Sequence, residues 1–335
     1  MIKALVLLSG GLDSVLAARV LMDQGIEVVG LCFKSYFFNS EQAKKSALAL
    51  GIELVEADFS DEHLAMVKNP KYGYGKNMNP CVDCHALMLK KAKEIMGKSR
   101  YDFVATGEVL GQRPMSQNRQ ALKTVEKAAG MEGKLLRPLS AKLLDETEIE
   151  KSGKAEREKL FDISGRSRNA QMRMAEKYGI KEYASPGGGC ILADSEFGAK
   201  LLKMFEYWPD CGGHDVELLK CGRVFWFKNQ RGSDILFVIG RNQKDNERLE
   251  KFAKRDDIMI ELAEENGPAS LIRGMENKPR IMDKMPEINV PEKLEISGLK
   301  MGENKSEAEI FAAVMALTGY YSVKARGKKM KFIIK

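Results

Sequence analysis

The sequence predicts an α/β protein in which helices cover both faces of a mainly parallel sheet, followed by a smaller α+β domain. Short apolar runs alternate with helix-like stretches over the first 205 residues, an order typical of a parallel sheet. A glycine pair joins the first apolar run to the first helical stretch. The composition changes near residues 207–213, where Pro209 and the pair Gly212-Gly213 mark a turn or linker. We therefore expect one domain at residues 1–205 and a second at residues 206–335.

The elements of the first domain follow from the spacing of apolar residues. The expected strands are residues 2–8, 27–33, 53–57 and 102–106, and the expected helices lie near residues 12–24, 40–50, 82–97, 144–160 and 166–178. Because the carboxyl ends of parallel strands lie at one edge of a sheet, we expect the ligand site at that edge.

The second domain combines strands and helices in a different order. Strand-like runs occupy residues 217–227, 234–240 and 257–262, and a charged amphipathic stretch at 242–254 predicts a helix. Ser306 and Glu309 have the spacing of a capping box and predict the start of another helix. The apolar residues that follow on one face of this helix are Ile310, Val314 and Leu317.

Composition limits the class of protein. Of the 335 residues, 44% are hydrophobic and 30% are charged, values typical of a globular protein rather than a membrane protein. No apolar run is long enough to span a bilayer, and the chain enters a strand at once without a signal-like segment, so we expect no membrane partner and a cytoplasmic location. The net charge of +7 favours a polyanionic partner.

Residues 9–14, Ser9-Gly10-Gly11-Leu12-Asp13-Ser14, follow the first expected strand directly. A Gly-Gly turn at a helix N-terminus directs backbone N–H groups and partial positive charge to one point, which suits phosphate. Ser9 and Ser14 add hydroxyl donors. Asp13 would repel phosphate unless it holds a Mg²⁺ ion. The alternative is a plain corner between a strand and a helix.

This segment resembles the PP-loop of the ATP pyrophosphatase superfamily, which has a HUP-like fold. No Gly-Lys-Ser/Thr follows the glycines, so the segment is not a Walker loop. The resemblance implies that ATP is bound, that the loop holds its β,γ-pyrophosphate, and that a substrate oxygen attacks the α-phosphorus. It also implies that adenine lies near the end of the second strand, where Leu31 and Phe33 are the matching candidates; the alternative for Phe33 is a place in the core.

Cysteines form the second motif. Six cysteines in such a chain are expected as ligands, nucleophiles or core residues rather than disulfides. Cys81 and Cys84 begin an expected helix after Pro80 and are followed by His85. Haem attachment is disfavoured because it requires export, whereas a zinc site with His85 and a redox dithiol both remain open. A fourth interpretation adds Cys190, which follows Ser185-Pro186-Gly187-Gly188-Gly189.

Three cysteines suit an iron–sulfur cluster with one open iron, which binds hydrosulfide. This pattern is similar to that of thiolation enzymes in the PP-loop superfamily, and the resemblance implies a cluster, expected as [4Fe–4S], held by Cys81, Cys84 and Cys190. The alternative without a cluster uses these cysteines as persulfide carrier and resolving thiol. For Cys32, Cys211 and Cys221 we expect buried core positions.

Residues 106–117 begin Thr106-Gly107-Glu108-Val109-Leu110-Gly111-Gln112. Together with Leu136-Arg137-Pro138-Leu139 they resemble tRNA 4-thiouridine synthetases. The resemblance implies an ATP-dependent tRNA sulfurtransferase that adenylates a uracil carbonyl and replaces its oxygen with sulfur from a cysteine desulfurase or free sulfide. Gly107 and Gln112 are then expected at the nucleotide and Arg113 at the RNA. The segment 150–180, which contains Gly165-Arg166-Ser167-Arg168, looks inserted relative to that family.

Two alternatives to 4-thiouridine formation stay open. Related enzymes that share the PP-loop and paired cysteines make 2-thiouridine. An interpretation from a different class is a nucleotide-gated RNA-binding protein without catalysis.

The segment from Val238 to Leu249, with later motifs that include Gly267-Pro268-Ala269 and Tyr320-Tyr321-Ser322, resembles the RNA-binding module of NFACT proteins. The resemblance implies that the second domain contacts an RNA backbone, with tRNA as the expected partner. The candidate contacts are Arg241, Asn242, Lys244, Lys324, Arg326, Lys328 and Lys329. The alternatives are a strand-to-helix turn capped by Asn242 and a lysine-rich tail that protects an edge strand.

Overall fold

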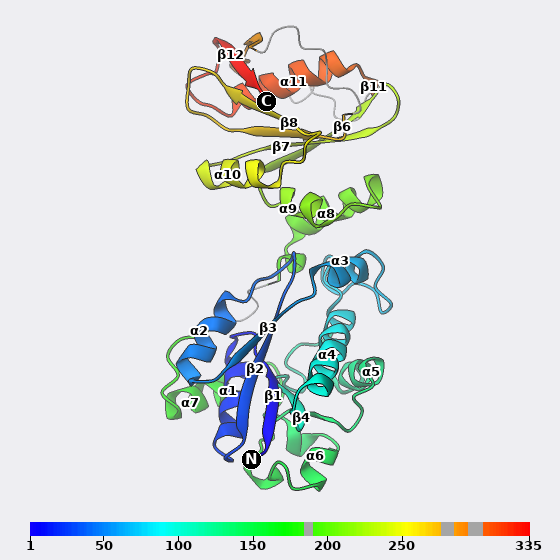
Figure 1. Cartoon of the computed structure of the whole chain (residues 1–335), viewed down its shortest axis with the longest axis vertical. Helices are drawn as coiled ribbons and strands as arrows, with labels where there is room; N and C mark the ends of the chain where they lie inside the picture. Colours follow the sequence, from blue (N-terminus) through cyan, green and yellow to red (C-terminus); the bar gives the residue numbers. More distant parts are fainter. Residues whose placement is uncertain (184–189, 276–284, 294–303) are drawn as a thin grey trace. The chain divides into compact units, whose positions relative to one another are not determined.

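The computed structural model describes residues 1–183, 190–275, 285–293 and 304–335 (Figure 1). These residues divide into two compact units, Met1–Gly198 and Ala199–Lys335. The glycine-rich segment that precedes Cys190, residues 185–189, lies outside the described residues. Among the described helices, none is both long enough and apolar enough to cross a membrane.

The first unit contains a parallel sheet whose described strands lie in the order β3-β2-β1-β4-β5. The strands are β1 (Lys3–Leu7), β2 (Glu27–Lys34), β3 (Leu54–Asp58), β4 (Phe103–Thr106) and β5 (Leu135–Leu136). Because all of them run in the same direction, their carboxyl ends share one edge. The predicted fold class, a parallel α/β sheet followed by a smaller domain, is confirmed.

Helices cover both faces of this sheet (Figure 1). They are α1 (Leu12–Met22), α2 (Glu41–Leu50), α3 (Ser60–Lys68), α4 (Cys81–Lys98), α5 (Arg119–Ala129), α6 (Glu148–Lys151) and α7 (Asn169–Lys177), and α8 (Ser195–Tyr207) begins at the end of the unit. Short 3-10 helices lie at Ala141–Leu143, Arg157–Lys159 and Ile191–Ala193.

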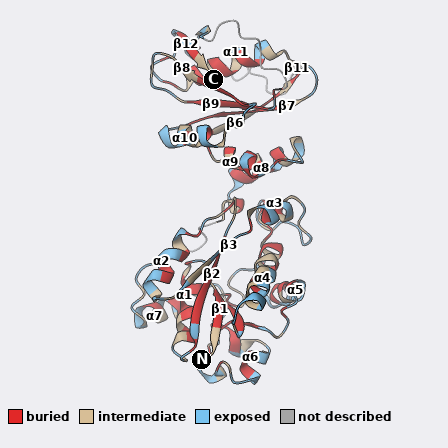
Figure 2. Cartoon of the chain, viewed as in Figure 1, coloured by how far each residue is buried: buried red, intermediate tan, exposed pale blue. Residues whose placement is uncertain are grey.

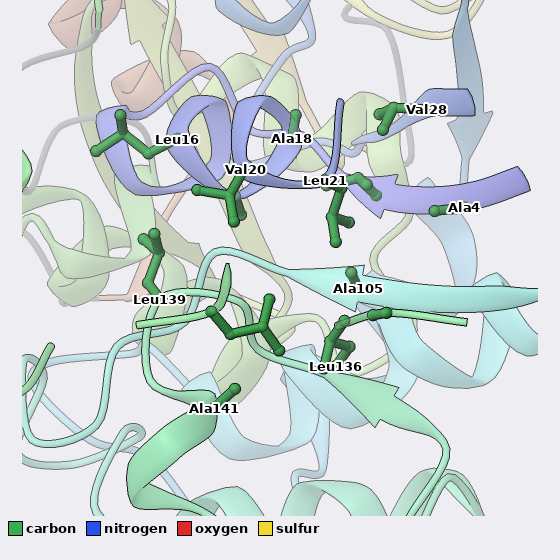
Figure 3. Packing of buried hydrophobic residues seen from close by; sticks show 14 of the residues in the cluster. Ala4, Leu16, Ala18, Val20, Leu21, Val28, Ala105, Leu136, Leu139 and Ala141 are labelled. Atoms are coloured by element: carbon green, nitrogen blue, oxygen red, sulfur yellow. The ribbon is translucent and has the colours of Figure 1, made fainter. Parts of the chain in front are cut away.

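The central strands are apolar on both faces because each face is covered by helices. Side chains alternate along β1: Ala4 and Val6 pack in the core beneath α1, whereas Leu5 packs in the core beneath α4. In that first core, Leu21 of α1 lies over Ala105 and Leu136, and Leu16 lies on the side of Leu139 (Figure 3). The strands are accordingly buried, while the outer faces of α2 and α5 are exposed (Figure 2).

The expected strands of this unit agree with the structure to within two residues, but two helices, α3 and α5, were not expected. The long helix expected near 144–160 is wrong. A four-residue helix, α6, begins at the capping box of Thr147 and Glu150 and ends before Gly153, whose φ of +71° lies in the left-handed region. A glycine in that conformation ends the helix, and the chain continues irregularly to the 3-10 turn at Arg157–Lys159.

The segment 150–180 is part of the core of the first unit rather than an accessory insertion. Its buried apolar residues Ala155, Leu160, Ile163 and Ala175 belong to the same cluster as α1. The helix α7 in this segment packs against α1. An apolar face that completes a core explains why this segment folds back onto the sheet.

The second unit contains a mostly antiparallel sheet with the order β10-β12-β8-β9-β7-β6-β11 among the described strands. Its strands are β6 (Arg223–Asn229), β7 (Asp234–Ile239), β8 (Ile258–Leu262), β9 (Ser270–Arg273), β10 (Glu287–Asn289), β11 (Asn304–Lys305) and β12 (Lys329–Ile334). Its helices after α8 are α9 (Gly213–Leu218), α10 (Gln243–Phe252) and α11 (Glu307–Tyr320).

Helix α11 confirms the capping-box prediction: Ser306 and Glu309 cap it reciprocally, and Ile310, Val314 and Leu317 are buried. The strand expected at 217–227 is wrong in its first half. Residues 213–218 are helical, because the Asp215 carboxylate accepts the Gly212 N–H and caps the helix start.

The lysine-rich tail does not form an edge strand. Its strand β12 pairs with β10 on one side and with β8 on the other. Met330 and Phe332 of β12 point into the core of the unit, and the lysines at 329 and 331 alternate with them on the opposite face.

A buried ion network holds α9 to the strands of the second unit. The Arg273 guanidinium donates to Asp215 Oδ1 at 2.6 Å and to Asp257 Oδ2 at 2.5 Å. Burial would raise the pKa of Asp215, but the Gly212 N–H, Lys254 and Arg273 lower it. These interactions hold the pKa of Asp215 below its ordinary value, and the Arg273 guanidinium donates hydrogen bonds to both Asp215 and Asp257.

Replacing Arg273 by Ala should destabilise the second unit by about 3–5 kcal/mol, because it removes the guanidinium that both buried carboxylates share. Both tryptophans, Trp208 and Trp226, lie in this unit, so urea unfolding followed by tryptophan fluorescence reports it. The matched control Lys244→Ala removes an exposed cation from the same unit and should change the free energy of unfolding by less than about 0.5 kcal/mol. Equal unfolding midpoints for the two variants would contradict the assigned role of the network.

Candidate functional site

Two glycines shape the loop between β1 and α1. Gly10 has φ +80°, and a Cβ there would lie 2.5 Å from the Gln42 backbone. Gly107 follows β4, and a Cβ there would lie 2.5 Å from the Asp13 carbonyl carbon and the Ser14 nitrogen. Both approaches exclude any side chain. The loops after β1 and β4 are therefore in backbone contact at the carboxyl edge of the sheet, where the sequence predicted the site.

Hydroxyl groups line this loop. The Ser14 hydroxyl donates to the Gly11 carbonyl at 2.8 Å, and the Gly11 N–H donates to the Ser9 oxygen at 3.3 Å. The two serine oxygens lie 3.4 Å apart. Ser9 is exposed and Ser14 is buried, so the loop presents one hydroxyl to solvent and fastens the other to its own backbone.

Asp13 is the centre of a polar cluster. Its Oδ2 accepts a hydrogen bond from the Gln112 amide at 2.6 Å, and the Arg168 guanidinium lies 3.8 Å away. Gln112 in turn accepts from the Gln171 amide at 2.8 Å. Gln112 was expected at the nucleotide. Arg168 and Gln171 were missed, because the sequence offers no local signal that α7 packs beside α1.

A buried charge network lies behind the loop that follows β4. Glu108 accepts from Arg137 Nε at 2.9 Å and from the Thr106 hydroxyl at 3.1 Å, and its Oε1 lies 2.9 Å from His85 Nδ1. Arg137 also pairs with Glu126. Burial would raise the pKa of Glu108, but the charges of Arg137 and His85 lower it to about 2. A carboxylate is an acceptor, so His85 Nδ1 carries the proton that it donates.

Cys81 and Cys84 lie in the first turn of α4, just before His85. Burial raises the pKa of the Cys84 thiol well above its ordinary value, and the neighbouring Cys190 and Cys81 raise it further. Burial also raises the pKa of Cys190 to about 11, and Cys81 contributes in the same direction. The structure thus brings the three predicted cysteines within electrostatic range of one another.

The chain that carries Cys190 is fastened to two parts of the first unit. The Ile191 N–H donates to the Phe37 carbonyl at 3.2 Å, and the Asn77 side chain donates to the Ala193 carbonyl at 2.7 Å. Phe37 follows β2, and Asn77 precedes the cysteine helix α4. Cys190 is therefore held between the end of β2 and the loop that leads into Cys81.

An aromatic cluster supports Phe37. The buried His63 ring stacks on Phe59 with centroids 4.8 Å apart, and Phe37 meets His63 edge-on at 5.3 Å. Burial lowers the pKa of His63 to about 4, so the ring is neutral at physiological pH. His63 acts here as an aromatic core residue.

Arg113 connects the cysteines with the first loop. It follows Gln112, which contacts Asp13, and its positive charge lowers the pKa of both Cys81 and Cys190 against the larger effect of burial. Its side chain is exposed. Of these two consecutive residues, Gln112 contacts Asp13 and the charge of Arg113 acts on the thiols.

The other cysteines lie in cores, as expected: Cys32, Cys211 and Cys221 are buried and form no disulfide. Within the described ranges, no group of three or more His, Cys, Asp or Glu side chains has the arrangement of a metal site. The three thiols at α4 and Cys190 are close but are not arranged as a ligand set around one point.

Leu31 and Phe33, the candidates for adenine contact, have buried side chains in the core beneath α4. Their side chains contribute to that core. A ligand at the end of β2 would meet the backbone and the residues that follow it.

The candidate RNA contacts of the second unit are exposed, but most have partners. Asn242 caps α10 by accepting from the Asp245 N–H, which is the turn that the sequence offered as an alternative. Arg241 pairs with Asp245 at 2.7 Å. Lys324 and Lys329 lie near Glu265 and Glu287, and Arg326 stacks over Tyr320 at 4.5 Å. Lys244 and Lys328 are exposed without a recorded ion pair among the described residues.

The family model described as "Thiamine biosynthesis protein (ThiI)" matches residues 2–178, more than half of the chain. The chain belongs to the ThiI family. The match covers the PP-loop, the cysteine helix and α7, so the segment that looked inserted lies within the ThiI match. The second unit lies beyond it.

Curated relatives match parts of the chain. A tRNA-specific 2-thiouridylase MnmA 3 from Bacteroides fragilis is 35% identical over 112 residues, which cover 31% of this chain and 30% of the relative. A probable tRNA sulfurtransferase from Moorella thermoacetica is 32% identical over 157 residues, covering 44% of this chain and 37% of the relative. The match thus spans about a third of the length of these relatives.

A solved structure titled "Crystal structure of a 4-thiouridine synthetase - RNA complex with bound ATP" is also similar. The sequence identity is 18% and the TM-score is 0.41, and the match covers 65% of this chain and 52% of the other.

The Glu108 network should make the first unit sensitive to acid. The pKa of Glu108 is about 2 in the folded state and about 4.3 in an unfolded chain. The contribution of Glu108 to the free energy of unfolding is therefore fully present above about pH 5 and is lost as the pH falls towards 2. Urea unfolding followed by circular dichroism should show a larger loss of stability over this interval for the wild type than for Glu108→Gln.

Tryptophan fluorescence, which reports only the second unit, provides the internal control for that experiment. Parallel pH profiles of the two proteins by circular dichroism would contradict the ionised state assigned to Glu108.

Proposed function

We propose that this protein is an ATP-dependent tRNA uridine sulfurtransferase that forms 4-thiouridine, with AMP and pyrophosphate as products. The observation that carries the proposal is the position of Gln112 and Arg113: the first contacts Asp13 of the phosphate-type loop, and the second lies in the field of the thiols. Activation by ATP and delivery of sulfur need such neighbouring sites, because the activated intermediate must meet sulfur before water.

The first step activates the uracil carbonyl. Its oxygen attacks the α-phosphorus of ATP, the bond between the α-phosphorus and the bridging oxygen breaks, and pyrophosphate leaves. The backbone N–H groups at Gly10 and Gly11, the N-terminus of α1 and the Ser9 hydroxyl suit the pyrophosphate charge. Gly107 holds the loop after β4 against the backbone at Asp13 and Ser14.

Asp13 fits a Mg²⁺ ion, because its Oδ1 is buried without a hydrogen-bond partner. A hard cation prefers such an oxygen, and Mg²⁺ there would neutralise phosphate charge. Asp13 is accordingly the proposed ligand in this loop.

The second step replaces oxygen by sulfur. A hydrosulfide group attacks the activated carbon, the carbon–oxygen bond breaks, and AMP leaves with the oxygen. The thiols of Cys81, Cys84 and Cys190 form no disulfide, and thiolate is a type of ligand that suits iron. An iron–sulfur cluster held by these cysteines would supply an open coordination position for hydrosulfide. The sulfur source would be a cysteine desulfurase or free sulfide.

We propose tRNA as the partner of both units. The second unit carries exposed cations on the turn before α10 and in the tail, which suit a phosphate backbone. Arg113 is exposed and its charge acts on Cys81 and Cys190, so it suits the RNA near the reacting base. The relatives named above act on tRNA by name, and this supports the same partner here.

A second candidate, 2-thiouridine formation, is favoured by the name of the Bacteroides fragilis relative. Nucleoside analysis of tRNA from a deletion strain distinguishes the two: loss of 4-thiouridine supports the proposal, whereas loss of 2-thiouridine alone supports the second candidate. Unchanged nucleosides with retained ATP and RNA binding would favour a binding protein without catalysis.

Asp13→Asn should reduce pyrophosphate release from ATP and tRNA by at least about 100-fold, since it removes the anionic oxygen that suits the metal. The measurement is pyrophosphate release at saturating ATP. Asp23→Asn, on an exposed site just after α1, is the matched control and should retain activity. Full activity of the Asp13 variant would contradict adenylation at this loop.

Cys81→Ala, Cys84→Ala and Cys190→Ala should each abolish 4-thiouridine formation in a complemented deletion strain. Anaerobically isolated wild-type protein should carry about four irons, and each of these variants should lose them. Cys221→Ala, which removes a buried thiol of the second unit, is the control and should keep both iron and thiolation. Thiolation without iron would replace the cluster by a persulfide on Cys190.

A further inference from the structure

Helix α7 is fastened to the PP-loop at two points. Arg168, immediately before the helix, places its guanidinium 3.8 Å from Asp13 Oδ2. Gln171, in the first turn, donates from its amide to Gln112 Oε1 at 2.8 Å, and the Gln112 amide donates to the same Asp13 oxygen at 2.6 Å. The orientation of Gln112 is determined, because a carboxylate only accepts and its NH₂ group must face Asp13.

This cluster contains an unusual set of unpartnered polar atoms. Gln171 has no exposed surface, yet its Oε1 has no hydrogen-bond partner. Arg168 Nε and Asp13 Oδ1 are likewise buried atoms without partners. Buried polar groups of folded proteins are nearly always satisfied. A donor and an acceptor that remain open beside a phosphate-type loop point to a ligand with both anionic oxygens and a cation.

The charges at the loop lead to the same conclusion. Residues 9–14 contain an aspartate and no basic residue. A polyphosphate in this loop therefore needs a cation from another segment. Among the described residues, Arg168 is the basic side chain that forms an ion pair with Asp13. Its side chain is 17% exposed, so its charge acts in a site that is largely shielded from solvent.

We propose that Arg168 is a ligand of the ATP polyphosphate and donates from its guanidinium to a β- or γ-phosphate oxygen, while α7 forms one wall of the phosphate site. The proposal rests on the proposed function, since it assigns a further residue to the same ATP site. Arginine suits this role because its planar donors match phosphate oxygens and its Nε–H is open. In the free protein the guanidinium faces Asp13, and phosphate offers it a stronger acceptor.

A purely structural role for Arg168 makes a different prediction. If the guanidinium only compensated the charge of Asp13, its loss would disturb the loop and would weaken every ligand of the site similarly. If Arg168 binds phosphate, its loss should instead weaken the binding of molecules that carry the β- and γ-phosphates. The binding of molecules without these phosphates should not change. Comparison of ATP, inorganic pyrophosphate and adenosine separates the two roles.

The test is calorimetric titration of the full chain with MgATP, magnesium pyrophosphate and adenosine. Arg168→Ala should weaken MgATP and pyrophosphate binding by between about 10- and 100-fold, the effect of losing a charge-assisted hydrogen bond, and should change adenosine affinity by less than about twofold. Arg168→Lys should recover part of the pyrophosphate affinity, because it restores the charge without the planar donors.

Arg166→Ala is the matched control, since Arg166 is an exposed arginine two positions away. It should bind all three ligands as the wild type does. Wild-type affinity of Arg168→Ala for MgATP, or equal losses for adenosine and MgATP, would overturn the proposal. A wild-type protein that binds no MgATP would instead overturn the proposed function, so the two failures are distinguishable.

Discussion

The arrangement of the site depends on one close contact, the approach of Gly107 to the backbone at Asp13 and Ser14. A Cβ at Gly107 would lie 2.5 Å from that backbone, so the contact exists only because the residue is glycine. It fixes the loop after β4 against the first turn of α1. The same loop then carries Gln112, which contacts Asp13, and Arg113, whose charge acts on Cys190.

The Glu108 network holds the cysteine helix to the same loop. Glu108 follows Gly107 directly and accepts hydrogen bonds from Arg137 and His85, and His85 follows Cys84 on α4. Burying these charges has a high desolvation cost, which only the full set of partners offsets. Such a network has one satisfied geometry, so it fixes the start of α4 relative to the PP-loop more strictly than apolar packing would.

Sequence patterns predicted the features whose residues are close together in the chain, such as strands, turns and helix caps. The run at β1, the glycines after it and the capping box at Ser306 each carry their structural signal within a few residues. Partners that meet across the fold carry no such signal. Arg168 and Gln171 reach Asp13 only because the apolar face of α7 packs on α1, and nothing in residues 165–171 by themselves indicates that contact. The lysine-rich tail likewise looks like an edge strand until its two pairing partners are known.

The candidate site is built from segments that meet because of the parallel sheet. Four segments, the loops after β1 and β4, the start of α4 and the start of α7, contribute polar or sulfur-bearing groups to the site. The parallel strands direct their carboxyl ends to one edge, so residues distant in sequence are brought together there and are joined by hydrogen bonds such as that from Gln112 to Asp13. An acyl-phosphate-like intermediate is short-lived in water, and chemistry that passes through one requires its second reactant nearby. The loop after β4 links the two groups in this respect, because Gln112 contacts Asp13 and the charge of the next residue, Arg113, acts on Cys81 and Cys190.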